Sequence, residues 1–208
     1  CEFAGNDDDF HARGGPLNVS ALRNGYPALD LLIKAAESCG YPHNPDYNGA
    51  SQEGFATYQV TQKNGMRYSA KKAYLEAARR RPNLRVITHA HVTGLVLEGA
   101  AGGAQRATGV TFQRHGYTQQ ATAGREVILS AGAIQSPQVL ELSGIGNPDH
   151  LASHGVAVKH GLAGVGENLQ DHYISRLSWR LTSDISINKK AHGIPLGLEI
   201  LRYLFTRR

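Results

Sequence analysis

One segment of the sequence constrains the fold more than any other, because it joins an apolar run to a helix through small residues. Val127 to Leu129 form an uninterrupted apolar stretch, which is typical of a β-strand covered on both faces. Ser130 to Ala133 follow as small residues, and Ser136-Pro137 offers an N-cap and a first-turn proline for a helix that ends at Gly144. A strand that enters a helix through a glycine turn predicts an α/β or mixed α+β fold.

The turn after this strand is a candidate ligand contact. The small residues Ala131, Gly132 and Ala133 allow a ligand or another backbone to approach closely. The start of the next helix presents free N–H groups and the positive end of the helix dipole, and ligands in open α/β sheets bind beyond the carboxyl ends of strands. From the residues alone, a tight connection that serves only packing is the more common explanation, so both interpretations stay open.

Periodicity and turn residues predict the other elements along the chain. Helices are expected from Pro27 to a stop at Gly40, from a Ser69 cap to Pro82, from Asn147-Pro148 to Gly155, and from Pro195 to Phe205. Strands are expected at Phe55–Gln62, Met66–Tyr68, Leu84–Thr88, Val92–Leu97, Ala107–Phe112, Val156–Val158 and from His172 to Trp179. Asn64-Gly65 favours a type I′ hairpin turn, and the strands from Leu84 to Phe112 are spaced as a meander.

Motifs for other chemistries are absent from the sequence. It has no GxGxxG, GxSxG or GxxxxGK[ST] pattern. His89 and His91 are two residues apart on an expected strand, but no third metal ligand accompanies them, so no metal site is predicted. Asp171-His172 is a possible acid–base pair, although neighbours on a strand point to opposite faces.

Composition excludes some partners and leaves others open. The formal net charge is +5, and the longest basic run is Arg79 to Arg81, so no nucleic-acid-binding stripe is expected. Two cysteines, Cys1 and Cys39, fit reduced thiols and a cytoplasmic location. No apolar run is long enough to span a bilayer. The chain does not begin with Met and its last residues follow an apolar helical pattern, so we expect an internal piece of a longer protein.

Two long motifs in order resemble the flavin-dependent glucose–methanol–choline (GMC) oxidoreductases. Val127 to Gly146 resembles the second signature of that family nearly position for position, and Gly164 to His172 resembles another of its hallmarks. Upstream segments resemble the middle region of the family in order, so the similarity covers most of the chain. The nearest likeness is to choline-dehydrogenase-like alcohol dehydrogenases.

The resemblance implies FAD as cofactor and two interleaved domains. Residues 1–62 would belong to the substrate side, residues 63–172 to part of a doubly wound FAD-binding domain, and residues 173–208 to the start of an antiparallel-sheet substrate domain. The valine matching Val92 contacts the adenine end of FAD in the family. The residues matching Ser130, Ala131 and Gly132 lie near the same end.

The resemblance also implies oxidation of an alcohol CH–OH group to a carbonyl, with hydride transfer to flavin N5. The pyrophosphate-binding GxGxxG turn and the catalytic histidine of the family lie outside this sequence, so no catalytic residue is nominated and the chain alone is expected to be inactive. Family members that act on choline carry a glutamate two residues after the histidine of the Gln-Asp-His motif. Here Ile174 takes that position, which favours an uncharged alcohol because a buried cation needs a partner charge.

Two other functions remain open at this point. The chain could be a non-catalytic fragment or subunit that contributes half of a flavin site. It could also belong to a flavin-containing lyase of the same fold. The sequence leaves the electron acceptor undetermined.

Overall fold

The computed structural model describes residues 2–3, 8–23, 25–100, 103–182 and 185–207. Helices and mostly antiparallel strands are mixed, as the sequence predicts. The chain forms two compact units, one from residues 1–85 and 177–208 and the other from residues 86–176. The expected flavin and substrate domains divide at other positions, and their assignment stays a prediction.

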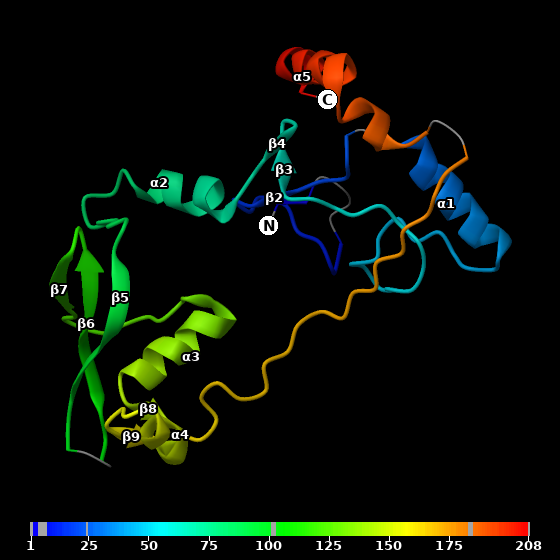
Figure 1. Ribbon diagram of the computed structural model, residues 1–208. Helices are drawn as coiled ribbons and strands as arrows, with labels where there is room; N and C mark the ends of the chain where they lie inside the picture. The colour runs from blue at the N-terminus through cyan, green and yellow to red at the C-terminus, as the bar shows by residue number, and fades with distance from the viewer. Residues whose placement is uncertain (1, 4–7, 24, 101–102, 183–184, 208) are drawn as a thin grey trace. The chain divides into compact units, whose positions relative to one another are not determined.

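The first unit carries helices and very short strand pairs (Figure 1). Its strands are β1 (Glu2–Phe3) beside β2 (Asn18–Val19), and β3 (Gln62–Lys63) beside β4 (Met66–Arg67). Its helical elements are α1 (Pro27–Ser38), a π-helix η1 (Lys71–Leu75), α2 (Glu76–Ala78), a 3₁₀ helix η2 (Ile187–Lys190) and α5 (Gly193–Thr206). The Tyr203 hydroxyl of α5 donates a hydrogen bond to the Gly65 carbonyl at 3.0 Å, which links α5 to the β3–β4 hairpin.

Two turns of this unit follow from their residues. Pro27 stands in the first turn of α1, and the chain leaves that helix at Gly40 with φ +87°, a conformation that glycine adopts without strain. Asn64 and Gly65 have φ of 53° and 71°, as a type I′ turn requires. These parts of the prediction are confirmed.

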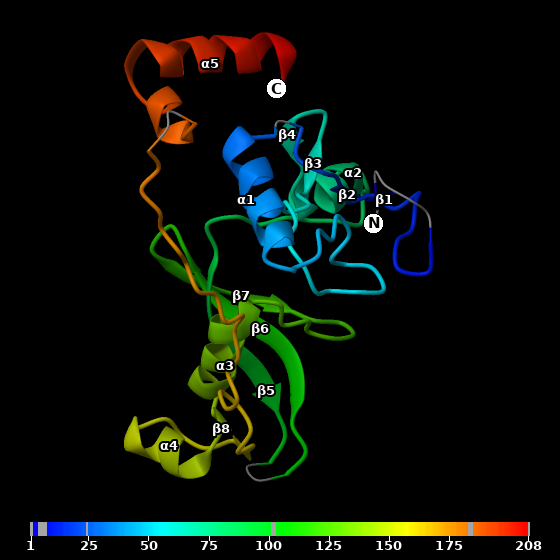
Figure 2. The ribbon, with the colours of Figure 1, turned by 90° about the vertical axis from the view of Figure 1, so that its right-hand side faces the viewer.

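The second unit is built on the three-stranded antiparallel sheet β5 (His91–Glu98), β6 (Arg106–Arg114) and β7 (Tyr117–Thr122). Helix α3 (Gly132–Leu142) packs against β5. Beyond the C-terminal end of α3 lie β8 (Ile145–Gly146), α4 (Pro148–Ser153) and β9 (His160–Gly161), with β8 and β9 parallel (Figure 2). Among the described residues, Phe112, Val139 and Leu151 form the buried apolar core of this unit.

Two of the three strands expected in the meander are confirmed as β5 and β6, but the expected strand Leu84–Thr88 is wrong. Leu84–Thr88 pairs with no strand among the described residues, and β7 takes the third place. Every residue of β7 is exposed, so the strand lacks the apolar alternation by which a sequence reveals a half-buried strand. The turn before it, His115-Gly116, has φ of 51° and 81° and resembles the Asn64-Gly65 turn.

Other expected strands are wrong for a shared reason. Within the described residues, the segments that lack ladder partners are Val127–Leu129, Val156–Val158 and His172–Trp179, and Phe55–Gln62 carries only isolated bridges and one residue of β3. An apolar run becomes a strand only where a neighbour completes its hydrogen bonds. Ile128, which the sequence places in a doubly covered strand, is 78% exposed.

Two helix starts also differ from the prediction. Helix α3 begins at Gly132, four residues before the expected cap, and Pro137 lies inside it. The expected helix after Ser69 opens as the π-helix η1, and Ser69 provides a backbone carbonyl to the Ala73 N–H rather than a side-chain cap. The predicted short helix after Asn147 is confirmed, because the Asn147 side chain accepts hydrogen bonds from the Asp149 and His150 N–H groups.

Candidate functional site

The candidate site lies at the N-terminal end of α3. Gly132 has φ +90° and turns the chain from the extended segment into the helix. The Ser136 hydroxyl accepts a hydrogen bond from the Ala131 N–H at 3.1 Å. Ser136 is the residue expected to cap the helix. It lies one turn inside α3 instead, and its hydroxyl holds the backbone of the turn that precedes the helix.

The first turn of α3 is open to a ligand. No side chain caps the helix start at Ala131, so its first N–H groups point outward with the positive end of the helix dipole. Ser130, Ala131 and Gly132 are exposed, and a Cβ added at Gly132 would meet nothing within 4 Å. The helix start therefore has no side-chain cap and is exposed, and its contact with a ligand stays a prediction.

A cavity of about 350 Å³ adjoins this turn. Ala133 and Pro137 of α3 form one wall, and residues 166–170 form the other. Gly166 has φ +81°, a conformation that glycine adopts without strain. A Cβ there would lie 3.4 Å from the Glu141 carboxylate, so the two motifs that carry the family resemblance lie against each other at this glycine.

Val92 takes a different position from the other nominated residues. It is the second residue of β5, half-buried and paired with Phe112 of β6, directly before an irregularity in the ladder. It does not line the cavity beside Ala133. The structure places Val92 on the strand that α3 contacts, and the cofactor contacts of Val92, Ser130, Ala131 and Gly132 stay predictions.

The histidines and acids named from the sequence do not form a catalytic pair in the described residues. His89 has φ +56° and lies outside β5, whereas His91 is its first residue, and both are exposed. The Asp171 carboxylate accepts a hydrogen bond from the backbone N–H of His172 at 2.7 Å. That contact orients the backbone and leaves the imidazole ring uninvolved.

In the first unit, His11 and two aspartates form a polar cluster that no sequence pattern predicts. The His11 side chain is 8% exposed, and its Nδ1 lies 2.9 Å from Asp8 Oδ1 while its Nε2 lies 3.3 Å from Asp46 Oδ1. One ligand atom from each residue lies within 4.8 Å of the others. The two ring nitrogens face different carboxylates, so the His11 side chain lies between Asp8 and Asp46. No sequence spacing reveals it, because 35 residues separate His11 from Asp46.

Comparisons with known proteins identify the class to which this fold and these motifs belong. The family model for GMC oxidoreductases matches residues 5–174. The chain therefore belongs to the GMC oxidoreductase family, whose cofactor is FAD.

Individual relatives are similar to this chain over nearly its whole length. Oxygen-dependent choline dehydrogenase 1 of Chromohalobacter salexigens is 42% identical over 182 residues, covering 86% of this chain and 32% of the relative. An alcohol dehydrogenase (acceptor) of Pseudomonas putida is 39% identical over 203 residues, covering 96% and 36%. A formate oxidase structure from Aspergillus oryzae, from work on FAD modification, superposes with a TM-score of 0.81 at 25% identity, covering 95% and 34%.

The chain spans about a third of the length of the curated relatives that it matches. The family, the mixed fold and the cofactor class that the sequence predicts are confirmed. Among the described residues, no helix is long and apolar enough to cross a membrane.

Proposed function

We propose that this chain is the central part of an FAD-dependent dehydrogenase or oxidase that oxidises the CH–OH group of an uncharged alcohol to a carbonyl. The observation that carries the proposal is the uncapped start of α3 beside the cavity formed with residues 166–170. Both walls of that cavity come from the motifs that define the family resemblance. A flavin accepts a hydride at N5 when it is bound in such an enzyme.

The residues of this chain fit an anionic, flat cofactor at this position. The free N–H groups at the start of α3 stabilise a negatively charged or hydrogen-bond-accepting group. The small residues Ser130, Ala131 and Gly132 leave space for its close approach. In this proposal they lie near the adenine end of FAD, and the Val92 backbone contributes a second contact at that end.

The proposed substrate is a primary or secondary alcohol without a positive charge. Relatives include both choline dehydrogenases and an alcohol dehydrogenase, so similarity does not choose between the two. Ile174 supports the uncharged substrate, because an aliphatic side chain gives no partner for a quaternary ammonium group. The electron acceptor stays open in this proposal.

The experiment is a substrate screen on the natural, full-length polypeptide with an artificial electron acceptor. Dye bleaching with uncharged primary or secondary alcohols, and slower bleaching with choline, is the expected result. A protein that binds FAD but cleaves substrate without bleaching the dye would instead be a flavin-containing lyase. Choline as the best substrate would contradict the substrate part alone.

The 208-residue chain by itself provides a second test. It should retain FAD weakly or not at all after desalting, because the pyrophosphate-binding GxGxxG turn is not in its sequence. It should also bind an apolar dye, since Ile128, Ile134 and Phe205 are between 73% and 85% exposed. If the desalted chain is a monomer that keeps yellow FAD and does not bind the apolar dye, the interpretation that it holds only part of a flavin site is contradicted.

A further inference from the structure

The polar cluster of Asp8, His11 and Asp46 joins two loops of the first unit. Asp8 and His11 lie between β1 and β2, and Asp46 lies between α1 and β3. Among the described residues, no other group of histidine, cysteine, aspartate and glutamate side chains brings three metal-ligating atoms within 4.8 Å of one another. Within that part of the chain, this cluster is therefore the candidate for a metal site.

Asp8 contacts the histidine in a way that fixes the orientation of its ring. Asp8 Oδ1 accepts hydrogen bonds from the backbone N–H groups of Phe10 and His11, at 2.9 Å each, and lies 2.9 Å from His11 Nδ1. A neutral imidazole that donates from Nδ1 presents a lone pair at Nε2. A carboxylate on the other ring nitrogen is the usual support of a metal-ligating histidine, so Asp8 fits the part of a positioning residue.

His11 Nε2 and Asp46 have the spacing of two ligands on one ion. Nε2 lies 3.3 Å from Asp46 Oδ1, which exceeds the length of about 2.7–2.9 Å that a charge-assisted N–H···O bond prefers. Two ligands about 2.05 Å from one tetrahedral ion lie roughly 3.3 Å apart. An ion can therefore bridge these two atoms without a large movement of either side chain.

The surroundings hold both of these ligands in place. The His11 side chain is 8% exposed, whereas that of Asp46 is 40% exposed. The backbone N–H of Asp46 donates to Asn44 Oδ1 at 3.0 Å, and its carboxylate accepts from Gln59 Nε2 at 3.3 Å. A buried ring beside a braced carboxylate makes a preorganised pair, and the exposed side of Asp46 leaves room for water.

We infer that His11 and Asp46 bind a divalent metal ion such as Zn²⁺, and that Asp8 positions the His11 ring for this contact. Zn²⁺ accepts imidazole nitrogen together with carboxylate oxygen, whereas Mg²⁺ and Ca²⁺ take oxygen ligands. Water molecules complete the coordination on the exposed side of Asp46. The bound ion ties the segment around His11 to the loop that follows α1.

The test is a ZnCl₂ titration of the 208-residue chain by calorimetry in chelator-free buffer at neutral pH. We expect one ion bound per chain, with the affinity reduced about tenfold or more in both His11→Gln and Asp46→Asn, since each removes a ligand. Asp8→Asn keeps an oxygen that can accept from Nδ1, so it should weaken binding less than Asp46→Asn. The unfolding temperature should rise with Zn²⁺ in the unsubstituted chain and not in Asp46→Asn, because an ion that binds only the folded state stabilises it.

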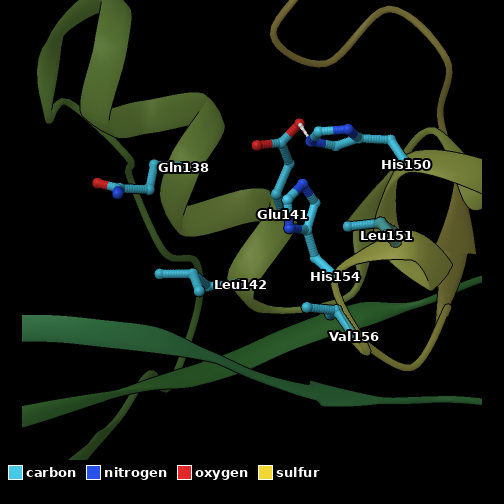
Figure 3. Close-up of a pocket in the computed structure, with 7 residues that line it drawn as sticks. All are labelled: Gln138, Glu141, Leu142, His150, Leu151, His154 and Val156. Carbon is cyan, nitrogen blue, oxygen red and sulfur yellow. Dashed lines mark ion pairs between the residues drawn. The ribbon is translucent and has the colours of Figure 1, made fainter.

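His150→Gln is the matched control. His150 Nε2 also faces a carboxylate, at 3.8 Å from Glu141 Oε1, and Figure 3 shows these two side chains directed toward each other at the pocket between α3 and α4. The His150 side chain is 52% exposed and belongs to no group of three ligands among the described residues, so its loss should leave the Zn²⁺ affinity unchanged. Cys39→Ser, which removes an exposed thiol, should leave it unchanged as well.

Three outcomes overturn the inference: no binding at millimolar Zn²⁺, an affinity that survives in Asp46→Asn, or an equal loss of affinity in His150→Gln. An equal loss in Asp8→Asn and Asp46→Asn overturns the positioning role of Asp8. Circular dichroism of each variant without metal establishes that a lost affinity does not come from unfolding. Because Asp46 is partly exposed, Asp46→Asn keeps the test decisive even where the buried substitution His11→Gln unfolds the chain.

Discussion

The hydroxyl of Ser143 accepts a hydrogen bond from the backbone N–H of Leu95 at 2.8 Å. The same hydroxyl donates to the Val139 carbonyl at 2.5 Å. Ser143 is 5% exposed and directly follows α3, while Leu95 lies in β5 between two irregularities of the β5–β6 ladder. One buried side chain thus fastens the C-terminal end of α3 to the strand that carries Val92.

Replacement of Ser143 by alanine should destabilise the second unit by about 1–3 kcal/mol, because it leaves the part-buried Leu95 N–H without its partner. Denaturant unfolding of the two proteins measures this difference. Ser153→Ala is the matched control, since the Ser153 hydroxyl also donates to a helix carbonyl, at 2.8 Å, but is exposed. Equal losses in the two variants would show that the bond to Leu95 contributes nothing.

Replacement of Gly132 by alanine should cost about 1–2 kcal/mol, because φ +90° places a Cβ in a strained backbone conformation. Open space surrounds the added methyl group, so the cost comes from the backbone and not from a collision. Gly164→Ala is the control, since that glycine also has open space but its φ lies outside the left-handed region. A Gly132→Ala protein as stable as Gly164→Ala would contradict the strained turn.

Local chemistry made some of this structure predictable from the sequence. Pro27, Asn64-Gly65 and Asn147-Pro148 each act locally, through backbone conformation or, for Asn147, through a side-chain cap. The elements that they start or turn therefore appear where the sequence places them. The family motifs were equally informative, because they are long and lie in the right order. The cavity between Ala133 and residues 166–170 was not foreseen, since it depends on the packing of two segments that sequence spacing does not relate.

Apart from the two helix starts, the mistaken features depend on distant partners. Val127–Leu129 is apolar enough for a buried strand, but no strand in the described part of the chain pairs with it. The polar strand β7 forms because it pairs with the free edge of β6. No hydrophobic pattern within Tyr117–Thr122 predicts this pairing. His11 and Asp46 approach each other only after the chain folds.

The Glu199 carboxylate should titrate below its ordinary pKa of 4.5. The hydrogen bond from Lys190 Nζ at 2.7 Å is the main cause of this lowered pKa. Desolvation opposes it, and the charges of Lys190 and Arg202 lower the pKa further. Because the folded-state pKa is lowered, the stabilisation is present above pH 4.5 and is lost as pH falls through the folded value. A carbon-detected NMR titration of Glu199 measures the midpoint.

In Lys190→Met, the Glu199 midpoint should move upward toward 4.5, because the donor of the main hydrogen bond is gone. Lys71→Met is the control, since Lys71 pairs with Glu76 at 3.4 Å instead of with Glu199. If the Glu199 midpoint does not move in Lys190→Met, the hydrogen bond from Lys190 is not the cause of the lowered pKa.

Ile174→Glu in the full-length enzyme should shift substrate preference toward choline. The proposed function attributes discrimination against a quaternary ammonium to the aliphatic side chain at this position, and a carboxylate there would supply the missing partner charge. The ratio of kcat/KM for choline to that for an uncharged alcohol should rise about tenfold or more, which corresponds to about 1.4 kcal/mol of transition-state stabilisation. Ile174→Gln is the control, because glutamine is polar and similar in size to glutamate but carries no charge. If the two variants have equal ratios of kcat/KM for choline to kcat/KM for an uncharged alcohol, a charge at position 174 does not determine substrate specificity. The family assignment would be unaffected.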